Sequence, residues 1–168
     1  VTLSTVGLVP MMDKLAQEKL MPNLAVSLHA SNEETRRTIV PPTKKYSMQD
    51  ILDACKRFPV SKRRRIMFEY VMLAGVNDSD VDARQLVKVL SGIKAKVNLL
   101  PLNAAAGIPF ERPSDERVNA FAKILADRGL MVSVRKSRGR DIRAACGQLI
   151  VEGQQARRSA GQKLAAEL

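Results

Sequence analysis

Hydrophobic positions in this chain form short apolar runs that alternate with amphipathic stretches, as expected for βαβ units. The apolar runs predict strands at residues 1–5, 24–28, 65–73, 96–100 and 130–135. Apolar residues at helical spacing predict helices at residues 11–19, 48–57, 81–91 and 115–128, with a helical turn at 32–40. The strand runs are nearly continuous in apolar residues, which is typical of strands covered on both faces. The pattern therefore predicts an α/β fold built on a parallel sheet.

Local signals at the predicted helix ends support this assignment. Ser47 has an acceptor side chain and Asp50 follows three residues later, which predicts a capped start for the helix at 48–57. Ser114 takes the same place before the helix at 115–128, and Gly129 follows the end of that helix.

Polar side chains stand at the C-terminal ends of the predicted strands. They are Ser4, Ser27, His29, Glu69, Asn98 and Asn103. In α/β barrels the chemistry collects at these ends, so the pattern predicts a common site there. The alternative is the ordinary polarity of loops. Glu69 is either buried at the site or paired with an arginine, and the sequence assigns it no role.

Cys146 lies in the segment GRDIRAACGQL, close behind a cluster of cations. These cations are Arg135, Lys136, Arg138, Arg140 and Arg143. Nearby cations favour the thiolate form of a cysteine, so the pattern predicts a nucleophile that works on a polyanion. The alternative is a buried cysteine that acts as a small core residue. Cys55, in the amphipathic stretch 48–57, is predicted to be a core residue.

The charge balance points to a polyanionic partner. The 168 residues hold 28 Lys and Arg against 17 Asp and Glu, a net charge of +11. Such an excess favours nucleic acid as a partner, although aromatic residues, at 4%, are too few for a base-stacking surface. Two cysteines and no secretory segment suggest a reducing, cytoplasmic setting, and no apolar run reaches membrane-spanning length.

Several familiar site patterns are missing from the sequence. It has no phosphate-binding P-loop and no G-x-G-x-x-G fingerprint. It has no closely spaced Cys or Cys/His group, so no metal site or iron–sulfur cluster is predicted within this chain. Because the first residues already read as a strand, we expect the chain to be part of a longer fold.

Five segments resemble one enzyme family. They are VTLSTVGLVP, LAVSLHASNEETRRTIVP, FEYVMLAGVND, VNLLPLN and VRKSRGRDIRAACGQL. In this order they resemble the RlmN family, radical-SAM enzymes that methylate C2 of adenine in large-subunit rRNA and in tRNA. The resemblance implies that residues 1–150 form the second half of a radical-SAM partial (β/α)6 TIM-like barrel. Residues 151–168 would be a basic tail, either helical or frayed.

The resemblance also implies residue roles. Residues that match the family's contacts to S-adenosylmethionine (SAM) are Ser4, Ser27, Leu28, His29 and Asn103. Cys146 matches the cysteine that accepts the methyl group of one SAM and carries it to adenine, after radical activation by a second SAM. The five cations before it are assigned to RNA phosphates near the target.

Further partners follow from the same resemblance. The cysteines that hold the [4Fe-4S] cluster would lie upstream of this chain. The cysteine that resolves the protein–RNA intermediate would also lie upstream. This chain alone would therefore be inactive. The complete enzyme is expected to be a cytoplasmic monomer that binds rRNA and tRNA and receives electrons from a donor such as a flavodoxin.

Three alternatives remain open at this point. A sister family methylates C8 of adenine in the same rRNA region and shares much of this pattern. A non-catalytic basic RNA-binding module would bind RNA without any response to SAM. A self-sufficient cysteine enzyme would need Cys146 and His29 as a nucleophile–base pair within hydrogen-bond reach.

Overall fold

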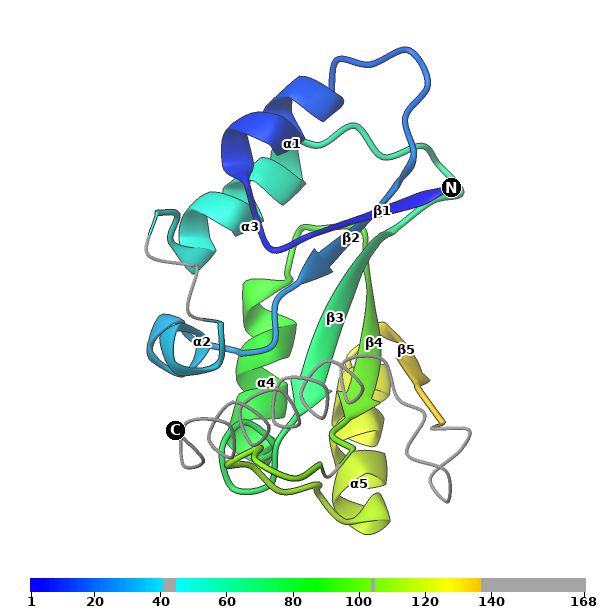
Figure 1. The fold of residues 1–168 in the computed structure, drawn as a ribbon. Coiled ribbons are helices and arrows are strands. Elements are labelled where there is room, and N and C mark those ends of the chain that lie inside the picture. The colour runs from blue at the N-terminus through cyan, green and yellow to red at the C-terminus, as the bar shows by residue number, and fades with distance from the viewer. Residues whose placement is uncertain (41–44, 104, 137–168) are drawn as a thin grey trace, which may run out of the picture.

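The structure is a computed structural model that describes residues 1–40, 45–103 and 105–136. Its centre is one open sheet of five parallel strands in the order β1-β2-β3-β4-β5 (Figure 1). The strands are β1 (Thr2–Thr5), β2 (Asn23–Ser27), β3 (Ile66–Met72), β4 (Ala95–Pro101) and β5 (Met131–Val134). The predicted α/β fold with a parallel sheet is confirmed.

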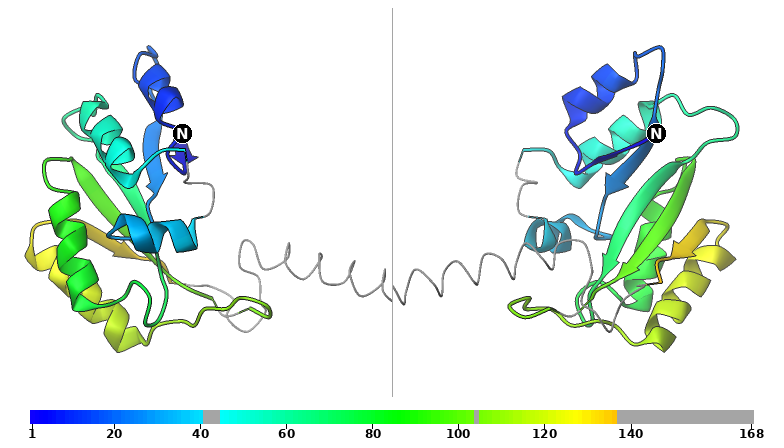
Figure 2. Two further views of the ribbon diagram at one scale, coloured as in Figure 1. Left: turned by 90° about the vertical axis from the view of Figure 1, so that its left-hand side faces the viewer. Right: turned by 45° about the vertical axis from the view of Figure 1, so that its right-hand side comes forward.

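The helices connect successive strands. They are α1 (Val9–Leu15), α2 (Glu33–Ile39), α3 (Met48–Arg57), α4 (Asp80–Val89) and α5 (Asp115–Asp127). Helices α1, α3, α4 and α5 lie on one side of the sheet (Figure 2). No helix in the described ranges is both long enough and apolar enough to cross a membrane.

The core lies between these four helices and the sheet. Phe68 and Val97 point from the strands into it and are fully buried, together with Leu86 of α4 and Phe121 of α5. The ring of Phe121 packs 5.3 Å from that of Tyr70, centroid to centroid. Burying this apolar surface is the main stabilising contribution to the fold.

The two faces of the sheet differ in their environment. Along β3, buried and half-buried residues alternate strictly, as a strand with period two requires. The prediction of strands covered on both faces is therefore wrong for β3, whereas β2 has three consecutive buried residues. We call the face opposite the four helices the open face.

The predicted helices agree with the structure except at α1. Helix α3 has the predicted bounds, and Ser47 and Asp50 form the reciprocal capping box. Helix α1 begins and ends earlier than the predicted range 11–19. Pro10 explains the early start, because a proline is well suited to the first helical turn, where its missing N–H is not needed.

Gly7 forms the turn between β1 and α1. Its φ is +106°, a conformation that side chains of L-residues rarely adopt. A Cβ atom at this position would lie 2.4 Å from Cδ1 of Ile51 on α3. The turn can pack directly on α3 only because the residue is glycine.

Candidate functional site

Polar residues form a row across the open face near the C-terminal ends of the strands. The strand register places Ser27 beside Glu69, Glu69 beside Asn98, and Asn98 beside Ser133. Ser4 of β1 extends this row towards the edge of the sheet. The structure thus brings together side chains from all five strands.

Glu69 connects the first three strands of this row. Its Oε2 accepts hydrogen bonds from Ser27 Oγ at 3.1 Å and from Ser4 Oγ at 3.5 Å. Its main-chain oxygen accepts bonds from the N–H groups of Leu28 at 3.0 Å and His29 at 3.2 Å. The sequence analysis assigned Glu69 no role and left two possibilities, a place at the site or pairing with an arginine. The structure places it at the site.

His29 follows β2 and is held in an uncommon backbone conformation, with φ of +62°. Its Nδ1 accepts a hydrogen bond from the Val71 N–H at 3.1 Å, which leaves the proton of the neutral ring on Nε2. Burial lowers the pKa of His29 below its usual 6.5, although the carboxylate of Glu69 acts in the opposite direction. His29 is therefore a neutral donor through Nε2 at pH 7.

This geometry weighs against one alternative. A general base needs a free lone pair, and the lone pair of Nδ1 is already used by Val71. His29 is thus poorly suited to act as the base of a Cys146–His29 pair.

Asn77 fixes the loop that carries His29. Its Nδ2 donates to the main-chain oxygens of His29 at 2.9 Å and Val71 at 2.7 Å, and its Oδ1 accepts from the Leu73 N–H at 2.8 Å. The side chain is fully buried, and Tyr70 donates its hydroxyl to the Asn77 main-chain oxygen. The sequence analysis missed this residue, because its contact with His29 joins two strand connections that lie far apart in the sequence.

Arg36 fixes the ends of β1 and β2 from the helix α2. It is fully buried, and its Nε donates to Leu28 O at 3.1 Å. One Nη donates to Val6 O at 2.8 Å and to Ser27 O at 3.3 Å. Burial lowers the pKa of Arg36, and Glu33 acts in the opposite direction. The sequence analysis missed Arg36 because its segment is rich in charge and reads as a solvated turn.

The remaining predicted cofactor residues differ in their surroundings. The Leu28 side chain is wholly buried in the core, so only its main chain faces the site region. Asn103 is half-buried, just after β4. The roles of both residues in binding SAM stay predictions.

The predicted RNA contacts are only partly described. Arg135 and Lys136 are exposed just after β5, and the Arg135 N–H continues the ladder to Leu99 O at 2.9 Å. The other predicted residues of this segment lie outside the described residues: Arg138, Arg140, Arg143 and Cys146. The predicted domain boundary at 150/151 also lies there.

Cys55 is a core residue, as predicted. It is 2% exposed, within the cluster formed by α3 and the sheet. Burial raises the pKa of its thiol to about 12, so it stays protonated and unreactive at neutral pH.

Polar side chains on the open face offer hydrogen-bonding groups. In the ranges that the structure covers, no three His, Cys, Asp or Glu side chains are grouped as metal ligands. Hydroxyl, amide, imidazole and carboxylate groups line the open face instead, and these can hydrogen-bond the ribose and amino acid parts of SAM.

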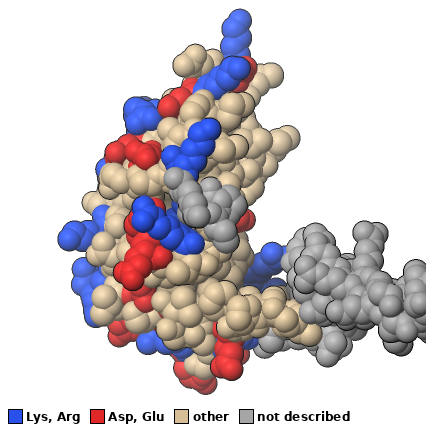
Figure 3. Space-filling model, turned by 60° about the vertical axis from the view of Figure 1, so that its left-hand side comes forward, with Lys and Arg blue, Asp and Glu red and all other residues tan. Residues whose placement is uncertain are grey.

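Charge on the surface of the described residues is mixed. Figure 3 shows basic and acidic side chains interspersed on one face of the molecule. Ion pairs such as Arg57–Asp13 and Arg37–Glu33 belong to this pattern. The net positive charge is therefore not spread evenly over the surface.

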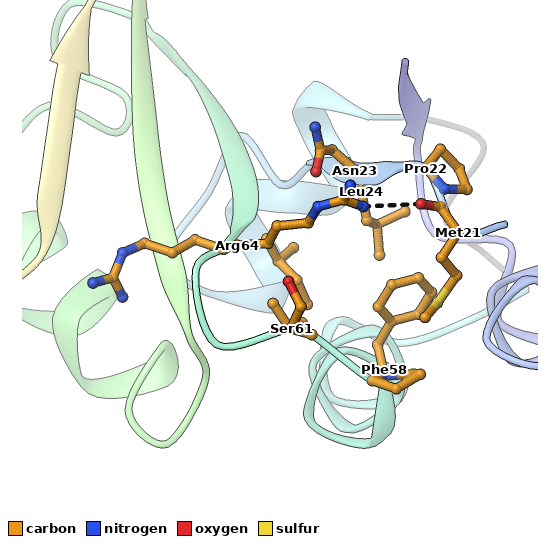
Figure 4. A pocket seen from close by; sticks show the side chains of 11 residues that line it. Met21, Pro22, Asn23, Leu24, Phe58, Ser61 and Arg64 are labelled. Carbon is orange, nitrogen blue, oxygen red and sulfur yellow. Dashed lines mark hydrogen bonds between the residues drawn. The ribbon is translucent and has the colours of Figure 1, made fainter.

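A pocket of about 340 Å³ lies at the opposite end of the sheet, where the strands begin. Met21, Leu24 and Phe58 line it, and Arg64 closes one side by donating to Met21 O at 3.0 Å (Figure 4). It is remote from the row on the open face.

Comparison with known proteins gives many relatives. The chain is 49% identical over 148 residues to a probable dual-specificity RNA methyltransferase RlmN of Koribacter versatilis, covering 88% of this chain and 43% of that protein. It is 51% identical over 152 residues to the RlmN of Desulfosudis oleivorans, covering 90% and 41%. No family model matches the chain.

Solved structures agree with these relatives. A radical SAM methyltransferase from Sphaerobacter thermophilus superposes with a TM-score of 0.82 at 50% identity, over 88% of this chain and 43% of that one. A domain of a pyruvate-formate lyase-activating enzyme from Bacteroides vulgatus has a TM-score of 0.62 at 19% identity, over 80% of each chain, and supports the fold alone.

Fold and sequence together define the class: the chain has the architecture of a radical-SAM methyltransferase, with the sheet left open. Within that class it belongs to the RlmN family. It spans about two fifths of the length of the curated relatives that it matches.

Proposed function

We propose that this chain forms part of a radical-SAM enzyme that methylates C2 of adenine in large-subunit rRNA and tRNA. One observation carries the proposal: in a chain of RlmN-family sequence, Ser4, Ser27 and His29 converge beside Glu69 at the C-terminal edge of the sheet. SAM, when bound, supplies the methyl group and, with a reduced [4Fe-4S] cluster held by residues outside this chain, the radical chemistry.

The residues of this chain have distinct roles in the proposal. The hydroxyls of Ser4 and Ser27, Nε2–H of His29, the main chain of Leu28 and the amide of Asn103 hold SAM. The Cys146 thiolate accepts a methyl group as S-methylcysteine, because adenine C2 is itself electrophilic and cannot take a methyl cation directly. Phosphates of the RNA near the target are bound by Arg135, Lys136, Arg138, Arg140 and Arg143.

Two partners complete the proposed reaction. An electron donor such as a flavodoxin reduces the cluster, and the complete enzyme acts as a monomer on rRNA and tRNA. The relatives' names support RNA as the substrate class.

Replacing Cys146 in the complete enzyme tests the proposal. We expect Cys146→Ala to retain SAM binding but lose all methyl transfer to RNA. In the active enzyme, peptide mass spectrometry should find an added methyl group on Cys146 and none on Cys55. Cys55→Ala is the matched control, because its buried thiol is unreactive, and it should keep methylation if it folds.

The product distinguishes the alternatives. Nucleoside analysis should find 2-methyladenosine, whereas 8-methyladenosine would assign the chain to the sister activity. Binding of RNA with no methylation and no response to SAM would favour the non-catalytic module. Methylation that survives Cys146→Ala would contradict the proposed role of this cysteine.

A further inference from the structure

Glu69 is the acidic group at the centre of the polar row on the open face. It is half-buried, and its neighbours in the row are the uncharged Ser27 and Asn98. In the described residues, the hydrogen-bond partners of its carboxylate are two serine hydroxyls, which carry no charge. The carboxylate is therefore positioned but not neutralised by these partners.

Nearby cations among the described residues do not neutralise Glu69 either. Arg36 donates its Nε and one Nη to main-chain oxygens of Leu28, Val6 and Ser27, and it forms no ion pair with Glu69 among the described residues. Lys96 is exposed on the same face of β4 but stands one row closer to the start of the strands, and the described part of the chain shows no ion pair between it and Glu69. His29 is neutral at pH 7.

The hydrogen bonds also fix the direction in which the serine hydroxyls donate their protons. A carboxylate can only accept, so Ser4 and Ser27 must donate their single protons to Glu69 Oε2. On the same row, Ser133 Oγ lies 3.0 Å from Asn98 Oδ1 and donates to it. All three hydroxyls are left with lone pairs only, and Glu69 Oε1 adds a further acceptor.

The serine hydroxyls and Glu69 thus form a cluster of acceptors around one negative charge, beside the donor groups His29 Nε2–H and Asn98 Nδ2. A ligand that fits it must bring donors, such as hydroxyl or ammonium groups, and gains from carrying positive charge. A neutral or anionic ligand would leave the carboxylate uncompensated.

We propose that Glu69 is a ligand-binding residue: it orients Ser4 and Ser27 as acceptors and supplies the negative charge that favours a cationic, hydroxyl-bearing cofactor. This inference rests on the proposed function, in which that cofactor is SAM. SAM has ribose hydroxyls, an ammonium group and a positive sulfonium. Its demethylated product, S-adenosylhomocysteine, has the same donors but no sulfonium charge, so Glu69 discriminates between the two.

The test is calorimetric titration of the complete, cluster-containing enzyme with SAM and with S-adenosylhomocysteine. Glu69→Gln removes the charge and keeps the shape, so SAM affinity should fall by about tenfold, the scale of one charge-assisted hydrogen bond. S-adenosylhomocysteine affinity should fall by about threefold or less. Ser27→Ala removes an acceptor but no charge, so it should weaken both ligands by similar factors.

Two further variants make the result decisive. Glu116→Gln, the same substitution at an exposed position on α5, should change neither affinity. Glu69→Asp keeps the charge, so it should keep the wild-type preference for SAM over S-adenosylhomocysteine. This variant provides the test if Glu69→Gln fails to fold. Equal weakening of both ligands by Glu69→Gln, or no weakening, would overturn the role of Glu69 alone. Failure of the wild-type enzyme to bind SAM would overturn the proposed function and this inference together.

Discussion

At the scale of single residues, hydrogen bonds fix whether each polar group of the site can donate or accept. His29 illustrates this, because the Val71 N–H occupies Nδ1 and the left-handed backbone aims the ring. Protonation of Nδ1 would replace an acceptor by a donor that faces another donor. The buried, neutral state of His29 is therefore part of the folded structure.

This dependence predicts a pH effect on stability. Burial lowers the pKa of His29 from 6.5, so just below pH 6.5 the unfolded chain binds more protons than the folded one. The free energy of unfolding should therefore decrease as the pH falls below 6.5, and this loss should be absent above it. Thermal unfolding at pH 5.5 and 7.5 should show a smaller pH difference for His29→Asn than for the wild type. Asparagine is the matched substitution because it tolerates positive φ. An equal pH difference in both proteins would contradict the role assigned to His29.

At the scale of elements, the sequence predicts what depends on local pattern. The start of α3 is an example, because Ser47 and Asp50 carry the whole capping signal within four residues. The common site was also predictable, since the C-terminal ends of parallel strands share one edge. The contacts Glu69–Ser27, Arg36–Val6 and Asn77–His29 were not predictable, because each joins segments that lie far apart in the sequence and meet only in the folded sheet.

The turn between β1 and α1 gives a prediction at this scale. Gly7→Ala should lower the free energy of unfolding by about 2 kcal/mol or more, because it combines backbone strain with a clash against Ile51. Gly75→Ala is the matched control: φ is also positive there, +70°, but no atom lies within 4 Å of the added Cβ. Chemical denaturation should show about 1 kcal/mol for the control, the cost of strain alone. Equal losses in the two variants would show that the contact with Ile51 does not matter.

At the scale of the whole molecule, the sheet is open at β1. Among the described strands, β1 pairs only with β2. Apolar side chains lie exposed on and just after it, with Leu3 at 45%, Leu8 at 51% and Met11 at 57%. Unpaired strand edges with apolar neighbours favour association with other chains.

The 168-residue chain expressed alone should therefore self-associate. Sedimentation velocity should find species larger than a monomer, and the double variant Leu3→Lys/Met11→Lys should shift the distribution towards monomer. Val81→Lys is the control, since Val81 is 67% exposed on α4, away from this edge, and should change nothing. A monomeric wild-type chain at micromolar concentration would contradict the prediction.

The buried Arg36 has a consequence for how this region opens. Its guanidinium joins α2 to the last carbonyls of β1 and β2, so none of the three segments can detach without exposing broken bonds of the others. Amide protons in α2 and at the end of β2 should then exchange with solvent as one cooperative unit, at a common rate. The backbone that carries Ser27 and His29 would thus unfold locally as one cooperative unit, which the Arg36 side chain stabilises.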